Sequence, residues 1–363
     1  MYWASKAREL SSLIKQSMAK TGIVKDIRYL DHIAHYPHVE SPKRLRGIYA
    51  VLEKGDLAGK FMEITPRMAN HWELEWIHTP AYINHITSTK GKPLTILDPD
   101  TYASPLSYDT AKLAVGGVFS ILDYLFRRDI SNGFALVRPP GHHAEANRAM
   151  GFCIFNNIAL GAKYAMQVHG AKKALIVDWD LHHGNGTQNA FYKDPHVLYF
   201  STHQFPYYPG SGNYDEVGEG EGKGYTVNVP LRAGQDDKVY IQIFRRILSP
   251  IALSFKPDII LVSAGFDVYF DDPLGGMRVT PKGLAAITRI LLGLAGDLCD
   301  GKILFVLEGG YNIKGLRECM MAVLKEMFSE SILKEDDLSQ GEEESINPHI
   351  EKVIKFQKQF WPL

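Results

Sequence analysis

Residues 177–188 read VDWDLHHGNGTQ and continue an apolar run that begins at Ala174. A near-continuous apolar run of this kind is typical of a strand that is buried on both faces of a parallel sheet. The run ends abruptly in two carboxylates, two adjacent histidines and two glycines. The stretch therefore predicts a core strand whose carboxyl end delivers ionisable groups to one edge of a sheet.

Short β-branched runs of the same character recur along the chain and alternate with stretches of helical period. The predicted strands are Phe134–Val137, Ala174–Val177, Val197–Phe200, Tyr225–Val229, Ile259–Val262 and Ile303–Leu307. The predicted helices between them include Thr110–Arg127, Ile154–Val168, Lys238–Phe255 and Leu284–Leu298. This alternation predicts an α/β fold with a mostly parallel sheet and helices on both faces.

The length and composition fit one large domain with an extension at each end. The chain has 363 residues, of which 45% are hydrophobic, and this is ample for a large core. We expect a main domain over residues 25–330, an N-terminal helical extension over residues 1–24, and an acidic C-terminal tail with a short helix over residues 331–363. The apolar face of the N-terminal helix would consist of Leu10, Leu13, Ile14 and Met18.

Several classes of protein are disfavoured by composition. The net charge of −1 gives no basic field for nucleic acid. No apolar run approaches the roughly 18 residues of a membrane span, and residues 1–20 lack the apolar stretch and cleavage site of a signal peptide. The three cysteines form no CxxC pair, so a disulfide framework is not expected. We therefore expect a cytoplasmic protein with no nucleic-acid or membrane partner.

Polar, glycine-rich sequence follows five of the predicted strands. The segments are RPPGHHAE (138–145), DWDLHHGNG (178–186), STHQFPYYPGSG (201–212), SAGFDVYFDDPLGG (263–276) and EGGYN (308–312). In an open parallel sheet, ligands bind outside the carboxyl ends of the strands. Because five segments converge on one edge, we expect the active site there.

Asp180 and His182 are two residues apart, so at an extended strand end their side chains point the same way. A carboxylate with an imidazole suits a borderline divalent ion such as Zn²⁺, although iron also fits such a site. Asp267, which follows another apolar strand, is the best candidate for a third ligand. An Asp-x-His alone is more often a loop or a cap, but two His-His pairs and a matching aspartate together favour metal-assisted hydrolysis.

Four of these motifs together resemble the zinc-dependent histone deacetylase family. They are RPPGHHAE with AMGFCIFNN (138–145 and 149–157), VDWDLHHGNGTQ (177–188), VSAGFDVYFDDPLGG (262–276) and LEGGYN (307–312). The family includes acetylpolyamine amidohydrolases and bacterial relatives and has an arginase-like α/β fold. The likeness runs from about Asp31 to about Phe328 and is closest to the class II deacetylases. It implies that residues 25–330 form a deacetylase catalytic domain.

The resemblance implies a role for each matching residue. Asp180, His182 and Asp267 match the zinc ligands. The catalytic set would be His142, His143, their respective partners Asp178 and Asn185, and Tyr311. Gly151, Phe152 and Tyr208 match the tunnel that takes up an acyl-lysine, although phenylalanine is more usual at position 208. A structural potassium ion would be held by Asp178, Asp180, His182, Ser201 and Thr202.

The chemistry of amide hydrolysis explains why such residues are needed. Zinc acidifies water and polarises the carbonyl, but two aspartates cancel its formal charge and leave a weaker Lewis acid. His143 would act as general base and then as general acid, while Tyr311 would stabilise the oxyanion. Asn185 can orient His143 but cannot stabilise its cation as an aspartate would. We therefore expect His143 to stay neutral to lower pH than with an aspartate partner.

Three functions stay open at this point. The first is removal of acetyl or other short acyl groups from lysine in proteins. The second is deacetylation of a small acyl-amine such as an acetylpolyamine. Some polyamine-specific relatives carry a glutamate where this chain has Leu274, and the apolar residue favours acyl-lysine. Dimerisation or the N-terminal helix could cap the site against proteins, so a homo-oligomer is also left open. The third is a reader that binds acyl groups without hydrolysis, which the complete set of site residues disfavours.

Overall fold

An eight-stranded parallel sheet forms the centre of the computed structural model, which describes residues 20–34, 36–53, 55–334 and 347–363. Its strands are β1 (Thr21–Val24), β2 (Phe61–Ile64), β5 (Asn132–Ala135), β6 (Ala174–Asp178), β7 (Val197–Gln204), β8 (Thr226–Leu231), β9 (Ile259–Ala264) and β10 (Ile303–Leu307). Their order in the sheet is β2-β1-β5-β10-β9-β6-β7-β8. The predicted parallel sheet is confirmed, and β6, β9 and β10 lie side by side at its centre.

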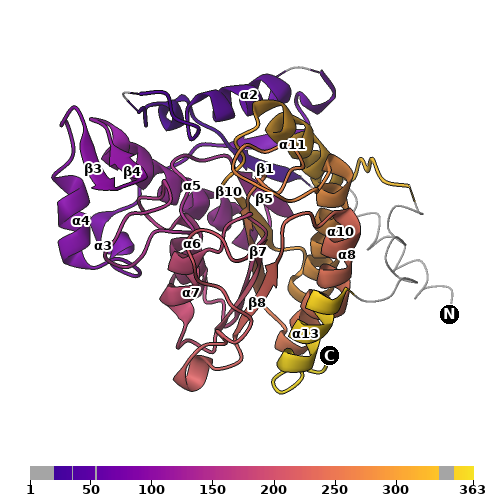
Figure 1. The fold of residues 1–363 in the computed structure, drawn as a ribbon. Coiled ribbons are helices and arrows are strands. Elements are labelled where there is room, and N and C mark those ends of the chain that lie inside the picture. The colour runs from indigo at the N-terminus through magenta and orange to yellow at the C-terminus, as the bar shows by residue number, and fades with distance from the viewer. Residues whose placement is uncertain (1–19, 35, 54, 335–346) are drawn as a thin grey trace.

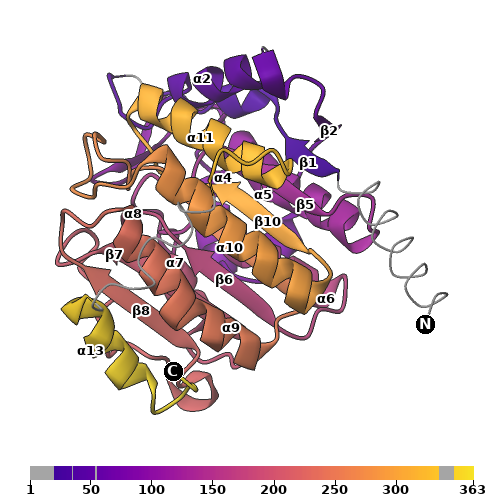
Figure 2. The same cartoon turned by 90° about the vertical axis from the view of Figure 1, so that its right-hand side faces the viewer.

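Helices cover both faces of the sheet. One face carries α5 (Ser107–Phe126) and α6 (Asn157–Gln167), with α7 (Asn185–Phe191) nearby. The other carries α8 (Asp237–Ile243), α9 (Ser249–Phe255), α10 (Pro281–Cys299) and α11 (Ile313–Met327), with α2 (Lys43–Leu52) against α11 (Figure 2). The predicted helix Lys238–Phe255 is continuous but includes a π-helical turn at Phe244–Leu248 between α8 and α9.

Smaller elements lie at the margins. The helices α3 (His71–Leu74) and α4 (Pro80–Thr87) lie with the antiparallel pair β3 (Thr95–Asp98) and β4 (Thr101–Ala103) at one side of the molecule (Figure 1). The C-terminal helix α13 (Pro348–Gln357) packs against the edge strand β8. Short 3₁₀ turns occupy Ile27–Leu30, Gly55–Leu57 and Gly220–Gly222. No helix within the described ranges is both long enough and apolar enough to cross a bilayer.

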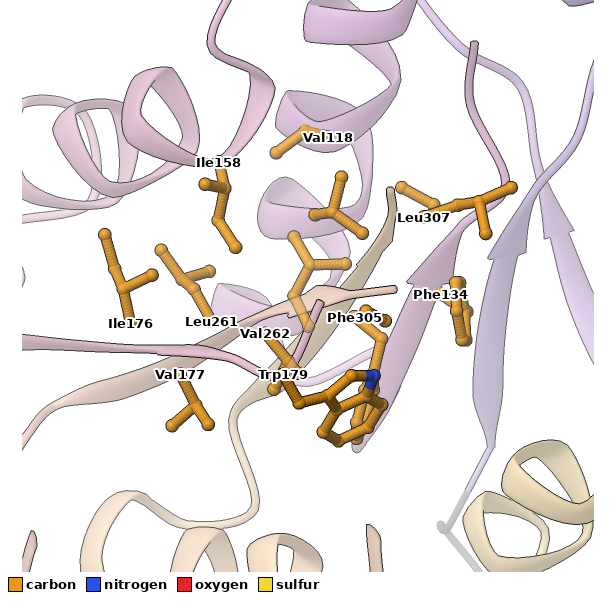
Figure 3. Close-up of a cluster of buried hydrophobic side chains, with 14 of the residues drawn as sticks. Val118, Phe134, Ile158, Ile176, Val177, Trp179, Leu261, Val262, Phe305 and Leu307 are labelled. Atoms are coloured by element: carbon orange, nitrogen blue, oxygen red, sulfur yellow. The ribbon is translucent and has the colours of Figure 1, made fainter. Parts of the chain in front are cut away.

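The central strands are apolar because both of their faces are buried. Ile176 and Leu261 lie on the same side of the sheet as Ile158 of α6 (Figure 3). On the other side, the Trp179 ring packs against Phe305, with 5.7 Å between ring centroids (Figure 3). Near-continuous burial explains why these strands read as apolar runs rather than as alternating patterns.

The N-terminal boundary predicted from sequence is wrong. The sequence pattern assigns Thr21–Val24 to a helical extension, but these residues form β1 between β2 and β5. These four residues are all buried, and hydrogen bonding to two neighbouring strands outweighs the weak local signal of a strand that contains Gly22. The expected amphipathic helix itself lies in residues 1–19, outside the described residues. Most of the acidic tail, residues 335–346, also lies outside them, whereas the short C-terminal helix is present as α13.

Candidate active site

The carboxyl ends of β6, β9 and β10 bring the predicted polar segments together. Asp178 is the last residue of β6, and Trp179 directly after it is fully buried in the core. Because successive residues of an extended chain point to opposite sides, Trp179 anchors the segment while Asp178 and Asp180 face away from it. The sequence Asp-Trp-Asp is therefore the local reason that two carboxylates lie at this edge.

Asp180, His182 and Asp267 form a cluster with the geometry of a metal site. The Nδ1 atom of His182 lies 3.2 Å from Asp180 Oδ1 and 3.1 Å from Asp267 Oδ2. One ligand atom from each of the three side chains lies within 4.8 Å of the others, and both carboxylates are buried. Backbone N–H groups hold the remaining oxygens, since Gly309 donates to Asp180 and Leu181 donates to Asp267.

The electrostatics of this cluster favour a cation. Burial lowers the pKa of His182, but hydrogen bonds to Asp180 and Asp267 outweigh it and raise this pKa to about 9. Burial and the Asp180 charge raise the pKa of Asp267 to about 7. A site that attracts a proton so strongly has excess negative charge, and a divalent ion bound by the same three atoms would neutralise it. The residues therefore fit a metal ion.

A second group of potential ligands lies close by and fits a metal poorly. It contains His142, Cys153 and Glu308, all buried. Burial raises the pKa of the Cys153 thiol well above its ordinary value, so the sulfur stays protonated. Glu308 Oε2 already accepts hydrogen bonds from the backbone N–H groups of Gly141 and His142. We interpret this group as the hydrogen-bonded support of the tandem histidines.

The tandem histidines each pair with the partner that the family resemblance implies. His142 Nδ1 lies 3.1 Å from Asp178 Oδ2, and His143 Nδ1 lies 2.8 Å from Asn185 Oδ1. Burial lowers the pKa of His142, but the charges of Asp178, Asp180 and Glu308 raise it to about 10. Burial and the neighbouring histidines hold the pKa of His143 well below its ordinary value. The two rings therefore differ in charge, with His142 cationic and His143 neutral.

A cavity of about 190 Å³ opens beside these histidines. Its lining includes the predicted residues His142, His143, Gly151, Phe152, His182, Tyr208, Leu274 and Tyr311, together with Asp100, Pro140, Tyr207 and Gly309. The Tyr208 ring meets His143 edge-on at 5.2 Å, and the Phe152 ring meets Tyr311 edge-on at 5.8 Å. The predicted substrate-binding residues therefore share one cavity with His182 and both tandem histidines.

Comparison with known proteins identifies the family. The histone deacetylase domain model matches residues 38–327. The chain belongs to the histone deacetylase family. It is 41% identical to histone deacetylase 15 of Arabidopsis thaliana over 353 residues, covering 95% of this chain and 63% of that protein. It is 38% identical to a probable deacetylase of Archaeoglobus fulgidus over 297 residues, covering 81% of this chain and 82% of that one.

The fold agrees with that of a solved relative. The crystal structure of the HDA15 HD domain superposes with a TM-score of 0.86 and 41% identity, covering 95% of this chain and 96% of that one. The deacetylase fold expected from the sequence is therefore confirmed. The chain spans less than two thirds of the length of these curated histone deacetylases, since it covers 63% of histone deacetylase 15 and 36% of histone deacetylase 6 of Caenorhabditis elegans, to which it is 39% identical.

Two residues of this histone deacetylase family member hold the cavity walls and were not singled out from sequence. The carboxylate of Asp100 accepts a hydrogen bond from Gly151 N, and Thr101 Oγ1 accepts one from Phe152 N. Both Gly151 and Phe152 have positive φ angles, +56° and +68°. A left-handed phenylalanine is unusual, so the neighbouring β3–β4 hairpin supplies side chains that hold this backbone in place.

Asp272 plays the equivalent part on the opposite wall. Its Oδ2 atom accepts hydrogen bonds from the backbone N–H groups of Tyr311 and Asn312, at 2.7 and 3.0 Å. Its Oδ1 atom accepts one from Leu274 N at 2.9 Å. One carboxylate thus ties the loop after β9 to the loop after β10. The sequence DDPLGG does not indicate this role, because nothing in it shows which of two adjacent aspartates turns inward.

Ser201 and Thr202 lie on β7, the strand that pairs with β6. Ser201 pairs with Asp178 in the register of β6 and β7. The hydroxyl of Ser201 lies 2.9 Å from His203 Nδ1. The hydroxyl of Thr202 is buried and makes no hydrogen bond of good geometry among the described residues, although the Tyr240 hydroxyl lies near it. A buried hydroxyl oxygen without a well-aligned donor is a group that a bound cation could contact.

Proposed function

We propose that this protein is a zinc-dependent hydrolase that removes acetyl or other short acyl groups from lysine side chains. The observation that carries the proposal is the cluster of Asp180, His182 and Asp267 next to a cavity shared by two histidines and Tyr311. Three protein ligands would leave a coordination position open, as catalytic zinc requires. When bound there, zinc would acidify a water molecule and polarise the substrate carbonyl.

His143 would act as the general base and then protonate the leaving amine. Its lowered pKa supports this role, because a base must be neutral to accept a proton. Its Nδ1 atom faces Asn185 Oδ1, so Nδ1 carries the proton and Nε2 is free to receive one. His142, with its raised pKa, would supply positive charge beside the reacting group rather than act as a base.

Tyr311 would stabilise the oxyanion that forms as water adds to the carbonyl. Burial raises the pKa of Tyr311 well above its ordinary value, so the hydroxyl stays protonated and can donate a hydrogen bond. The Arg44 guanidinium lies 5.0 Å from the centre of the tyrosine ring and helps to hold it. Removing one donor of this kind typically lowers the rate by about 10²–10³.

The cavity walls favour an extended apolar stem. Phe152, Tyr208 and Leu274 offer ring and methyl surfaces that suit the methylene chain of an acylated lysine. A polyamine carries additional positive charges, which an apolar Leu274 does not attract. We therefore favour acyl-lysine over an acetylpolyamine. We also propose a structural potassium ion near Asp178, Asp180, His182, Ser201 and Thr202, and the buried Thr202 hydroxyl, which makes no hydrogen bond of good geometry, supports it.

A metal-quantified substrate panel tests this proposal. We expect one zinc per chain, loss of activity with a chelator and recovery on adding zinc. We also expect kcat/KM for an acetyl-lysine peptide to exceed that for N-acetylspermidine. The variant Leu274→Glu should shift this ratio toward the polyamine, whereas Leu253→Glu, at an exposed position of α9, should leave it unchanged. A zinc-loaded protein that binds acyl-lysine without hydrolysis would overturn the proposal in favour of a reader.

A further inference from the structure

Asn185 connects the candidate base to a carboxylate that the proposed mechanism has not used. Its Oδ1 atom lies 2.8 Å from His143 Nδ1, and its Nδ2 atom donates to Glu145 Oε1 at 2.6 Å. The two ends of a primary amide are chemically different, since the oxygen only accepts and the nitrogen only donates. Glu145, when ionised, only accepts, so it requires the nitrogen of Asn185 on its own side. The oxygen of Asn185 is then directed at His143.

The position of Glu145 is itself fixed by several contacts. Asn189 Nδ2 donates to both carboxylate oxygens at 2.9 Å. Asn185 and Asn189 are four residues apart in α7, so they lie on the same face of that helix and both reach the same carboxylate. The backbone of Glu145 is held at both ends, because its N–H donates to Arg148 O and its carbonyl oxygen lies 2.9 Å from His78 Nδ1.

We propose that Glu145 is a positioning residue that sets the amide orientation of Asn185 and thereby the tautomer of His143. This inference rests on the proposed function. With the Asn185 oxygen facing it, His143 must carry its proton on Nδ1, and Nε2 stays available toward the cavity. Without the Glu145 carboxylate, the weak acceptor Met150 Sδ, 3.4 Å from Asn185 Nδ2, is left to oppose a turn of the amide that would present its NH₂ group to Nδ1. That arrangement favours the tautomer with the proton on Nε2, which cannot act as a base toward water.

Four variants distinguish an effect of the Glu145 charge from an effect of the Asn185 amide orientation. Glu145→Gln keeps an acceptor oxygen of similar shape, whereas Glu145→Ala removes it. In Asn185→Asp, either carboxylate oxygen can accept from His143 Nδ1. The other oxygen, however, would replace the Nδ2 atom that now lies 2.6 Å from Glu145 Oε1, so two negative charges would repel each other. The fourth variant combines Asn185→Asp with Glu145→Gln, whose NH₂ group can donate to the new carboxylate. The charge then sits on residue 185 and the amide on residue 145.

The effect of Glu145→Gln on kcat should have opposite signs in the natural chain and in the Asn185→Asp variant. In the natural chain, Glu145→Ala should lower kcat by roughly 10–100-fold with little change in KM, and Glu145→Gln should lower it less. In the Asn185→Asp background, Glu145→Gln should instead raise kcat at least tenfold. A residue with a merely structural role would lower activity in both backgrounds. Asn189→Ala, which removes a donor to Glu145 without touching Asn185, should cost less than Glu145→Ala.

A second readout does not depend on turnover. Two-bond ¹H–¹⁵N spectra of histidine-labelled, zinc-loaded protein report the tautomer of His143, assigned by the signal missing in His143→Ala. We expect an Nδ1–H tautomer in the natural chain and a mixed or Nε2–H signal in Glu145→Ala. An unchanged tautomer in Glu145→Ala, or a further loss on adding Glu145→Gln to Asn185→Asp, would overturn the inference. A natural chain with zinc, the Nδ1–H tautomer and no amidase activity would instead overturn the proposed function alone.

Discussion

Adding one methyl group at residue 309 should test whether Asp180, His182 and Asp267 bind a metal ion or are only buried polar residues. A Cβ atom at Gly309 would lie 2.3 Å from Asp267 Oδ2 and 2.7 Å from Asp180 Oδ2. Those atoms cannot shift without changing the position of the ligands. We therefore expect Gly309→Ala to weaken zinc affinity at least about tenfold, the lower end of the loss seen when residues supporting metal ligands are changed. Competition with a chromogenic chelator measures this.

The matched control is Gly293→Ala in α10. A Cβ atom at this exposed position meets nothing within 4 Å, so the change should leave zinc affinity intact. It should also stabilise the helix by up to about 1 kcal/mol. Equal zinc affinity in Gly309→Ala and the natural chain would count against Asp180 and Asp267 sharing an ion.

The protonation of the His143 imidazole should determine the pH at which activity falls on the acidic side of the pH–rate profile. Its pKa is held well below the ordinary 6.5 by burial and by His142 and His182. A general base is lost when it becomes protonated, so kcat/KM should fall only at a pH below 6.5. In the combined variant Asn185→Asp with Glu145→Gln, a carboxylate beside Nδ1 stabilises the imidazolium and raises that pKa. The acidic limb should then move to higher pH, and a limb that stays in place would contradict this.

At the scale of elements, the strands that could be predicted are those whose signal is local. β6, β9 and β10 are apolar along their whole length, because both of their faces are covered by helices. β1 and β2 have only four residues each, and β2 contains the exposed Glu63. Their pairing comes from partners far away in the chain, as in the register of Thr21 with Asn132. A contact over such a distance leaves no pattern in the local sequence.

The C-terminal segment should stabilise the open edge of the sheet beside β8. The indole N–H of Trp361 donates to Gly224 O at 2.8 Å, and its ring packs edge-on against Tyr225. These contacts lie at the amino end of β8, whereas the cavity lies at the carboxyl ends of the strands. We expect Trp361→Ala to lower the free energy of unfolding by about 1–3 kcal/mol without changing kcat/KM. Urea unfolding measures the loss, and Trp361→Phe, which keeps a ring, should lose less.

At the scale of the whole molecule, the site is assembled from loops that only the fold brings together. The predicted cluster of Asp180, His182 and Asp267 could be found from sequence because each residue follows a strand by a short step. The supporting residues Asp272 and Glu145 could not, because their hydrogen bonds depend on loop conformation. The expected C-terminal domain limit at residue 330 stays a prediction. At the N-terminal end, β1 shows that the sheet begins at Thr21 rather than after residue 25.

A buried group of charges joins three distant parts of this assembly. Glu40 accepts hydrogen bonds from Arg138, three residues after β5, and from Arg44 in α2. Arg44 in turn donates to the backbone carbonyl oxygens of Glu308 and Gly310, in the loop that carries Tyr311. All three charged side chains are fully buried. Removing one partner from such a group leaves buried charge without compensation, which typically costs about 3–5 kcal/mol.

This group should make stability depend on pH in a defined window. Burial raises the pKa of Glu40, but Arg138 and Arg44 outweigh it and lower this pKa to about 2 from 4.5. A lowered carboxyl pKa contributes stability above pH 4.5 that is lost as pH falls toward 2, and this shift corresponds to about 3 kcal/mol. The difference in unfolding free energy between the natural chain and Glu40→Gln should therefore be constant near neutrality and shrink below pH 4.5. A difference that stays constant down to pH 2.5, measured by urea unfolding, would mean that Glu40 contributes through packing rather than charge.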